Sequence, residues 1–443
     1  MTSVVGFFIY IIMQTKSNHW PWVISTNFSE GLPYAAVTTL SVVMLADMGL
    51  GNAEVAAYTS LLAMPWSLKA LWSPVVEIWR GKRWWMWMMQ VILACCFVGV
   101  AFGLLTASAQ GVGLWLSWVL TFFTIGAFTS ATYDIACDGF YMQVLDTDEQ
   151  SFFVGIRSTA YRLSMIFASG LLTSLVGLLA RHTGGDLQSA WVQVMIGVSL
   201  LMLCFAIAHA WLLPRPDKRA YPQSIQAQPN VVPTSASGAF LSTLSTFFQK
   251  PGLWFILLFL LFYRLGEALL SKMTILFLKA PVDAGGLGLD NTEYGLIYGT
   301  IGVGALTIGG ILGGMLVSKY GLKKCVVPLA LALNVPDLLY VWLSVSQPES
   351  RWLIGSCVGI EQFGYGLGFT AYMVFMLQSA KGPYQTAHYA IITALMAIGM
   401  NIPPMLSGWL QEFLGYTDFF WVVIACTIPG ILLSVWLTFK SQK

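Results

Sequence analysis

Two acidic residues four positions apart in an apolar segment are the strongest chemical signal in this sequence. Asp134 and Asp138 share one face of a predicted helix, because residues four apart lie one above the other. The next apolar segment carries Arg157 and Arg162. Ionisable groups are costly inside a bilayer and mark functional sites by default. We therefore expect these four residues to form a polar cluster that takes up a proton or an anion.

Two interpretations of this cluster remain open. It could bind a coupling ion, and Asp138 is then the first candidate for the proton, since burial favours the neutral form of a carboxyl group. It could instead be an ion-paired staple between two helices, because paired buried charges also serve structural specificity.

A second set of polar side chains lies in other apolar segments and could contact a solute or a proton. Each has a structural alternative: lysines can extend along the membrane toward water, Arg264 and Glu267 can pair locally, and His388 can be a packed histidine. The set consists of Glu30, Lys69, Tyr133, Tyr161, Arg264, Glu267, Lys272, Glu361 and His388.

Metal and cofactor chemistry has no sequence support. Seven cysteines fall in or beside apolar segments without a C-x-x-C spacing, and four histidines are scattered along the chain. We expect no disulfide framework, no metal site and no cofactor.

The elements that position these residues are predicted to be membrane helices. The chain is 57% apolar and 9% charged, whereas soluble domains average about 25% charged residues. A spanning helix needs about 20 apolar residues. We predict an all-α membrane protein whose twelve spans are 20–47, 53–76, 84–109, 112–144, 151–180, 188–213, 252–279, 292–317, 323–346, 350–379, 384–414 and 417–439.

Charge between the predicted spans alternates and gives the helices a direction. Segments 79–83, 215–250 and 318–324 are basic, whereas the gaps 45–54 and 283–293 carry Asp and Glu. Short basic loops stay in the cytoplasm, so both termini are predicted to be cytoplasmic. The net charge of +2 gives no indication of nucleic-acid binding.

The chain is predicted to consist of two repeated halves. Residues 49–54 read Gly-Leu-Gly-Asn-Ala-Glu and residues 288–293 read Gly-Leu-Asp-Asn-Thr-Glu, each before the second span of its half. Gly81 with Gly321, and Ser169-Gly170 with Ser407-Gly408, recur at nearly the same spacing. Parallel repeats of six helices are typical of transporters that bind substrate at the bilayer midplane. The predicted divisions are 1–19 (with Met13 as a second candidate start), 20–213, a polar linker at 214–250, and 251–443.

Two motifs resemble known transporters. Residues 314–324 resemble the loop signature of the major facilitator superfamily, with Ser318 where that family usually has Asp. Residues 131–139, Ala-Thr-Tyr-Asp-Ile-Ala-Cys-Asp-Gly, resemble the signature of the muropeptide permease (AmpG) and acetyl-CoA transporter family, with Tyr133 in place of Gln. The resemblance extends over nearly the whole chain apart from 1–18 and the linker.

This resemblance implies a proton-driven symporter that brings sugar-peptide fragments of peptidoglycan into the cytoplasm. We expect it to be a monomer in the bacterial cytoplasmic membrane. The residue types agree with such a ligand. Sugar rings stack on aromatic faces, and 14% of the residues are aromatic, including 18 Trp. Ligand carboxylates would pair with Lys69, Arg264 or Lys272.

Three alternatives remain. The cargo could be a siderophore, another saccharide, an acyl-CoA-like compound or a drug. A membrane-embedded enzyme is disfavoured, because the sequence has no G-x-S-x-G or H-E-x-x-H motif and the internal repeat favours alternating access. A sensor or assembly partner that has lost transport would explain the degenerate loop at 77–83, but not the retained intramembrane acids.

Overall fold

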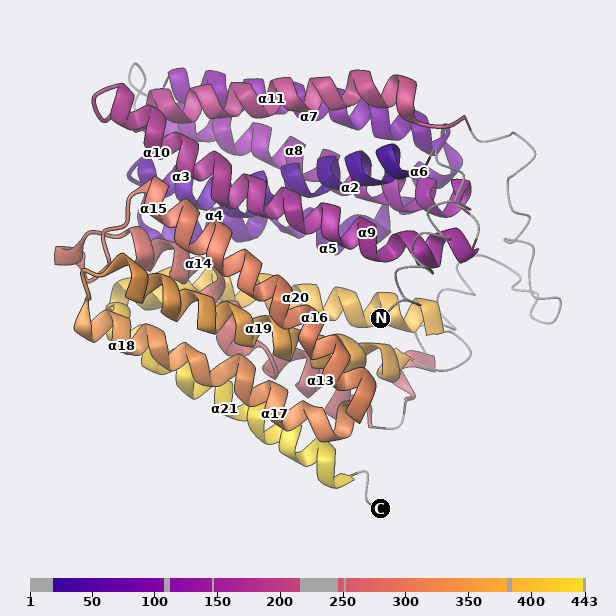
Figure 1. The fold of residues 1–443 in the computed structure, drawn as a ribbon, viewed down its shortest axis with the longest axis vertical. Helices are drawn as coiled ribbons and strands as arrows, with labels where there is room; N and C mark the ends of the chain where they lie inside the picture. The colour runs from indigo at the N-terminus through magenta and orange to yellow at the C-terminus, as the bar shows by residue number, and fades with distance from the viewer. Residues whose placement is uncertain are drawn as a thin grey trace, which may run out of the picture. The chain divides into compact units, whose positions relative to one another are not determined.

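The computed structural model describes residues 19–106, 112–145, 147–215, 246–250, 252–380 and 385–440. Every regular element within these ranges is helical (Figure 1), so the predicted all-α fold is confirmed. Ten helices in this part of the chain are long and apolar enough to cross a membrane, and their ends agree with the predicted spans to within a few residues at most positions. Met13 and most of the linker at 214–250 lie outside the described residues.

The two other predicted spans also form helices. Predicted span 53–76 is divided into α4 (Asn52–Leu62), α5 (Met64–Leu68), a 3-10 turn η2 (Lys69–Leu71) and α6 (Ser73–Ile78). Pro65 cannot donate a backbone hydrogen bond and helps to end α4. Predicted span 350–379 is the continuous helix α19 (Arg351–Ala380).

The chain forms two compact units, each built from segments distant in sequence. Unit 1 comprises residues up to Val37, Leu68–Phe167 and Trp191–Ile225. Its helices α7 and α8 lie side by side (Figure 1), and α2 packs along α9. The long helices of unit 1 are α2 (Trp20–Ala35), α7 (Lys82–Leu105), α8 (Val112–Val144), α9 (Thr147–Ile166) and, from Trp191 onward, α11 (Leu187–Leu212).

Unit 2 contains Thr38–Ser67, Ala168–Ala190 and the chain from Gln226 onward. Helices α16 and α19 lie side by side in it (Figure 1). Besides α4 and α19, whose bounds are given above, its helices include α3 (Ser41–Asp47), α10 (Thr173–His182), α13 (Leu253–Phe262), α14 (Leu265–Lys279), η5 (Val282–Ala284), α15 (Asn291–Tyr294), α16 (Val303–Tyr320), α17 (Leu322–Asn334), α18 (Leu338–Ser346), α20 (Gln385–Leu414) and α21 (Tyr416–Lys440). The predicted division into halves at 214–250 differs from these units and stays a prediction.

Repeated small residues make equivalent close contacts in unit 2. Gly408 of α20 packs against the backbone of Asn52, where α4 begins. Gly170 packs in the same way against Gly299. Small residues allow helix backbones to approach closely, which explains why these glycines recur in both halves of the sequence.

Several spans change helical geometry midway. Short π-helical stretches join α2 to α3, α9 to α10 and α15 to α16; they are η1 (Ala36–Leu40), η3 (Phe167–Leu172) and η6 (Gly295–Gly302). Two further interruptions matter for the buried acids. The chain leaves helical geometry between α13 and α14 at Arg264, and a 3-10 turn η7 (Val335–Asp337) containing Pro336 separates α17 from α18.

Candidate functional site

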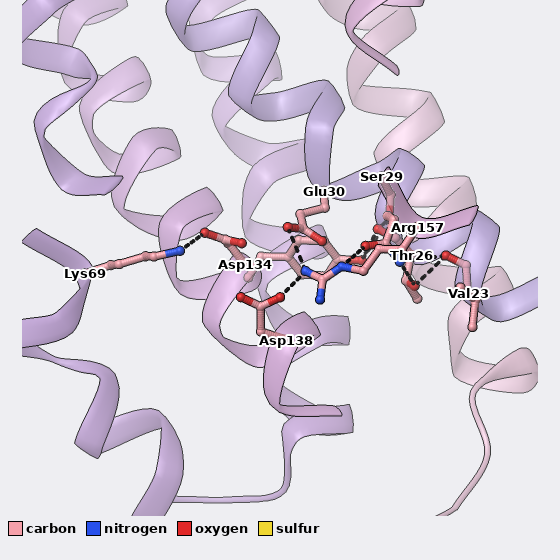
Figure 2. Close-up of polar contacts among 10 residues, drawn as sticks. Val23, Thr26, Ser29, Glu30, Lys69, Asp134, Asp138 and Arg157 are labelled. Carbon is pink, nitrogen blue, oxygen red and sulfur yellow. Dashed lines mark hydrogen bonds and ion pairs between the residues drawn. The ribbon is translucent and has the colours of Figure 1, made fainter. Parts of the chain in front are cut away.

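A cluster of ion pairs occupies the interior of unit 1 (Figure 2). The Lys69 ammonium donates a hydrogen bond to Asp134 Oδ2, and the Arg157 guanidinium donates one to Asp138 Oδ1. Glu30 Oε1 lies 3.7 Å from Arg157 Nη2. The structure therefore brings three predicted acids together with two of the predicted bases.

The acids of this cluster outnumber its bases. Carboxylate oxygens of Glu30, Asp134 and Asp138 lie within 4.8 Å of one another. Lys69 and Arg157 supply two positive charges, so one negative charge is left when all five groups are ionised. Glu30 is only 6% exposed, and its Oε2 has no hydrogen-bond partner among the described residues. An unpaired charge buried in this way is costly, and one bound proton would remove it.

Arg157 is held in place by α2. Its Nε donates to Asn27 Oδ1 at 2.7 Å, and Asn27 Nδ2 in turn donates to the Val23 carbonyl at 2.8 Å. The guanidinium also lies over the ring of Tyr141, 5.2 Å from its centroid. These contacts fix the guanidinium between Glu30 and Asp138.

Tyr133 belongs to a neutral hydrogen-bond network beside the ion pairs. Its hydroxyl lies 2.8 Å from Ser29 Oγ and accepts a hydrogen bond from Gln90 Nε2 at 3.1 Å. Gln90 also lies 2.8 Å from His209 Nδ1. Sequence reasoning missed Gln90 and His209, although a polar residue inside each of these apolar spans was a signal that could have found them.

The open side of the cluster is formed by Lys69 and Asp138. Their side chains are 34% and 39% exposed. Lys69 lies at the break between α5 and α6, three residues before Trp72, whose indole N–H donates to Thr132 Oγ1 at 3.1 Å. A carboxylate of an entering solute could therefore reach the Lys69 ammonium group from this side.

Two other predicted residues of unit 1 make no described hydrogen bond or ion pair to the acids of the cluster. Arg162 is half-buried and makes no hydrogen bond or ion pair with any residue that the structure describes. The Tyr161 ring lies 6.2 Å from the Tyr34 ring, centroid to centroid. The predicted pair of arginines therefore contributes only one member to the cluster, and Lys69 supplies the second base.

The predicted bases of unit 2 have separate environments. Lys272 donates to the Thr38 carbonyl at 2.6 Å. Arg264 donates to the Tyr365 hydroxyl and lies over the Phe369 ring, 4.6 Å from its centroid. Among the described ion pairs none joins Arg264 to Glu267, so the predicted local pair is not formed.

His388 is a packed histidine in this structure. Its Nε2 lies 3.2 Å from Thr246 Oγ1, and its ring packs edge-on against Phe247.

Glu267 and Glu361 come together with a third acid, Asp337. Their carboxylate oxygens lie within 4.8 Å of one another, and all three side chains are buried. Sequence reasoning missed Asp337, although an Asp beside Pro336 within an apolar run was visible. We call Glu267, Asp337 and Glu361 the acid triad.

Comparison with known proteins identifies related chains. The family model described as Major Facilitator Superfamily matches residues 266–443. The Anhydromuropeptide permease of Escherichia coli is 26% identical over 413 residues, which cover 92% of this chain and 77% of that protein. An AmpG-type transporter of Rickettsia conorii is 24% identical and covers 93% of this chain and 94% of its own. These matches confirm the resemblance predicted from the sequence.

Solved structures share the fold. A bacterial homologue of the human lysosomal transporter Spinster, in an inward-facing and unoccupied conformation, matches with a TM-score of 0.68 at 15% identity, covering 97% of this chain and 98% of that one. A D-xylose–proton symporter matches with a TM-score of 0.67 at 12% identity, over 95% and 96% of the two chains. The chain therefore shares the fold of these two proteins.

Proposed function

We propose that this chain is an AmpG-like permease of the major facilitator superfamily, a secondary transporter that carries muropeptides across the bacterial cytoplasmic membrane into the cell. The observation that carries this proposal is similarity to a named anhydromuropeptide permease along nearly the whole chain. Internal repeats and intramembrane charges are typical of alternating-access carriers. We place both termini in the cytoplasm and expect a monomer.

The cluster of unit 1 offers suitable chemistry for such a ligand. A muropeptide carries sugar rings and carboxylates. Lys69 offers an ammonium group on the open side of the cluster, three residues before the half-buried Trp72. A ligand carboxylate that paired with Lys69 would compete with Asp134 for the same ammonium group.

This competition would couple substrate to protons. Once Lys69 turns to the ligand, Asp134 loses its partner and joins Glu30 and Asp138 in a site with excess negative charge. These three carboxylates then face Arg157 alone, and two negative charges are uncompensated instead of one. Uptake of one proton would offset the charge that the ligand brings, because like charges at this separation cannot all stay ionised at low cost. Asp138, on the open side, is the entry point that we propose for the proton.

Uptake into proteoliposomes tests cargo and coupling together. The full chain is reconstituted, and radiolabelled anhydro-muropeptide is offered with and without an inward proton gradient. We expect accumulation that collapses when an uncoupler is added. Absence of uptake by folded protein would contradict the proposed cargo. Accumulation that is unchanged when the uncoupler is added would contradict proton coupling.

Single neutralising substitutions test the site. Asp138→Asn should abolish accumulation driven by the gradient, while exchange of labelled for unlabelled ligand at equal concentrations continues, because exchange needs no net proton movement. Glu349→Gln is the matched control, since Glu349 is exposed outside the predicted spans. Full accumulation by the Asp138 variant would exclude Asp138 from coupling.

A further inference from the structure

The acid triad of unit 2 has a composition that the ion-pair cluster of unit 1 does not share. In unit 1, Lys69 and Arg157 pair with the acids. In the triad, Glu267, Asp337 and Glu361 are 5%, 1% and 2% exposed, and none forms an ion pair within 4.0 Å with a base that the structure describes. Three buried carboxylates without a paired base require positive charge from elsewhere.

Several oxygens of the triad lack partners. Both carboxylate oxygens of Asp337 and Oε2 of Glu267 are buried and accept no hydrogen bond from any described residue. Glu361 is partly satisfied, since its Oε2 accepts from the Tyr340 hydroxyl at 2.8 Å and from Gln362 Nε2 at 3.0 Å. Buried polar atoms are almost always paired in folded proteins, so these oxygens indicate an occupant.

The charged neighbour of the triad is already engaged. Arg264 precedes Glu267 by three residues, at the break before α14. Its guanidinium, however, donates to Tyr365 and lies over aromatic rings instead of pairing with an acid. Arg264 therefore does not pair with the triad oxygens, which are left to bind another group.

Two interrupted spans meet at this point. Glu267 lies in the first turn of α14, directly after the break at Arg264. Asp337 ends the 3-10 turn between α17 and α18. Helices broken within the membrane are a recurring feature of ion sites in transporters, because their ends present polar groups at depth.

We propose that the acid triad is a binding site for a hard cation of the size of Na⁺ or Ca²⁺. Carboxylate oxygens are the preferred ligands of such ions. A cation held at about 2.3–2.6 Å from each oxygen separates opposite ligands by about 4.6–5.2 Å. One oxygen of each acid in the triad lies within 4.8 Å of one oxygen of each of the other two, which is near enough for a single ion to contact all three. The site is independent of the cluster at Asp138 and of the identity of the cargo.

Thermal unfolding of the purified full chain in detergent tests the site without any sugar-peptide present. Tryptophan fluorescence gives the Tm in chloride salts of Na⁺, Ca²⁺, K⁺ or choline at fixed ionic strength and mildly alkaline pH, where few protons compete. We expect a saturable rise in Tm with Na⁺ or with Ca²⁺ and none with choline, because only a bound ion stabilises the folded state by mass action. The comparison of the two ions identifies which one binds.

Variants locate the ion. Asp337→Asn should weaken the apparent affinity roughly tenfold or more, whereas Glu349→Gln and Asp138→Asn should retain it. If the Asp337 variant does not fold, Glu361→Gln is used in its place, with the same expected loss of affinity. Binding of radiolabelled Na⁺ or Ca²⁺ is also measured directly on the unmodified protein.

Three results would overturn the proposal. The first is an equal Tm in all salts together with no radiolabel bound. The second is a Tm that depends on pH alone, which would show that protons occupy the triad. The third is loss of cation binding in Asp138→Asn but not in Asp337→Asn. Each of these leaves the proposed transport function standing, because no transport is measured.

Discussion

At the scale of single residues, Asp290 combines two contacts at the beginning of α15. Its Oδ1 accepts a hydrogen bond from the Glu293 backbone N–H at 2.8 Å, and its Oδ2 accepts one from Arg181. Partial burial raises the pKa of the Asp290 carboxyl, but the hydrogen bonds from Glu293 and Arg181 outweigh burial and hold the pKa below its usual value. The ionised form therefore stabilises the folded state at neutral pH.

Two substitutions separate these contacts. Asp290→Asn keeps a capping oxygen and loses the exposed ion pair, which contributes little. Asp290→Ala also loses the cap, at a further cost of about 0.5–2 kcal/mol. Thermal unfolding in detergent should therefore rank unmodified protein, Asn variant and Ala variant in falling order of Tm. An Asn variant as unstable as the Ala variant would contradict the capping role.

The pH dependence of this site has a definite sign. A depressed carboxyl pKa gives stability that is present above the unfolded-state pKa and is lost as pH falls through the folded-state pKa. The Tm difference between the unmodified protein and Asp290→Asn should therefore shrink on acidification. A difference that grows in acid would exclude the ion pair as its source.

Residue types and spacing predicted part of the candidate site. The four-residue spacing of Asp134 and Asp138 placed both in one cluster, as the structure has them. Lys69 was visible as an intramembrane base, but its pairing with Asp134 was not predictable. Lys69 lies at a helix break, and no periodic pattern in the sequence encodes the direction of its side chain there. Arg162 looked equivalent to Arg157 in sequence, yet only Arg157 faces the acids.

At the scale of helices, spans were predictable and their interruptions were not. Bilayer thickness sets the length of each apolar run, which is why ten predicted spans match described helices. Pro336 signals the break before α18, but the break at Arg264 contains no proline. The residues around Arg264 therefore give no local signal of that break. For the same reason, the sequence alone does not predict that Glu267 lies beside Asp337.

Two glycines with opposite surroundings test the packing of these helices. An added Cβ at Gly408 would lie 2.7 Å from the Asn52 carbonyl carbon, whereas one at Gly304 would meet no atom within 4 Å. Gly408→Ala should lower the Tm, because overpacking costs about 1–3 kcal/mol. Gly304→Ala should leave the Tm unchanged or raise it, because Ala favours helix by about 0.5–1 kcal/mol. Equal shifts in Tm for both variants would argue against close packing at Gly408.

At the scale of the whole molecule, unit 2 joins segments from both predicted repeats. Helix α4 packs along α20, and α10 packs along α15. The repeated sequence near residues 49–54 and 288–293 predicted that these helix ends are equivalent. It could not predict that they pack with partners from the other half, because contacts between distant segments leave no periodicity in one sequence.

A reversible cross-link tests whether these contacts open during transport. An added Cβ at Gly170 would lie 2.6 Å from Thr300 Oγ1, the atom that a cysteine at position 300 would replace with its sulfur. The two positions are therefore near enough for a disulfide, which joins Cβ atoms about 3.5–4.5 Å apart. Alternating access requires helices of the two repeats to separate on one side of the membrane in each cycle. The double variant Gly170→Cys with Thr300→Cys should therefore lose muropeptide uptake on oxidation and regain it on reduction. The single variants under the same oxidant are the controls for the seven native cysteines. Full uptake by protein shown to be cross-linked would mean that this contact stays closed throughout the cycle, and the moving boundary would then have to lie elsewhere in the bundle.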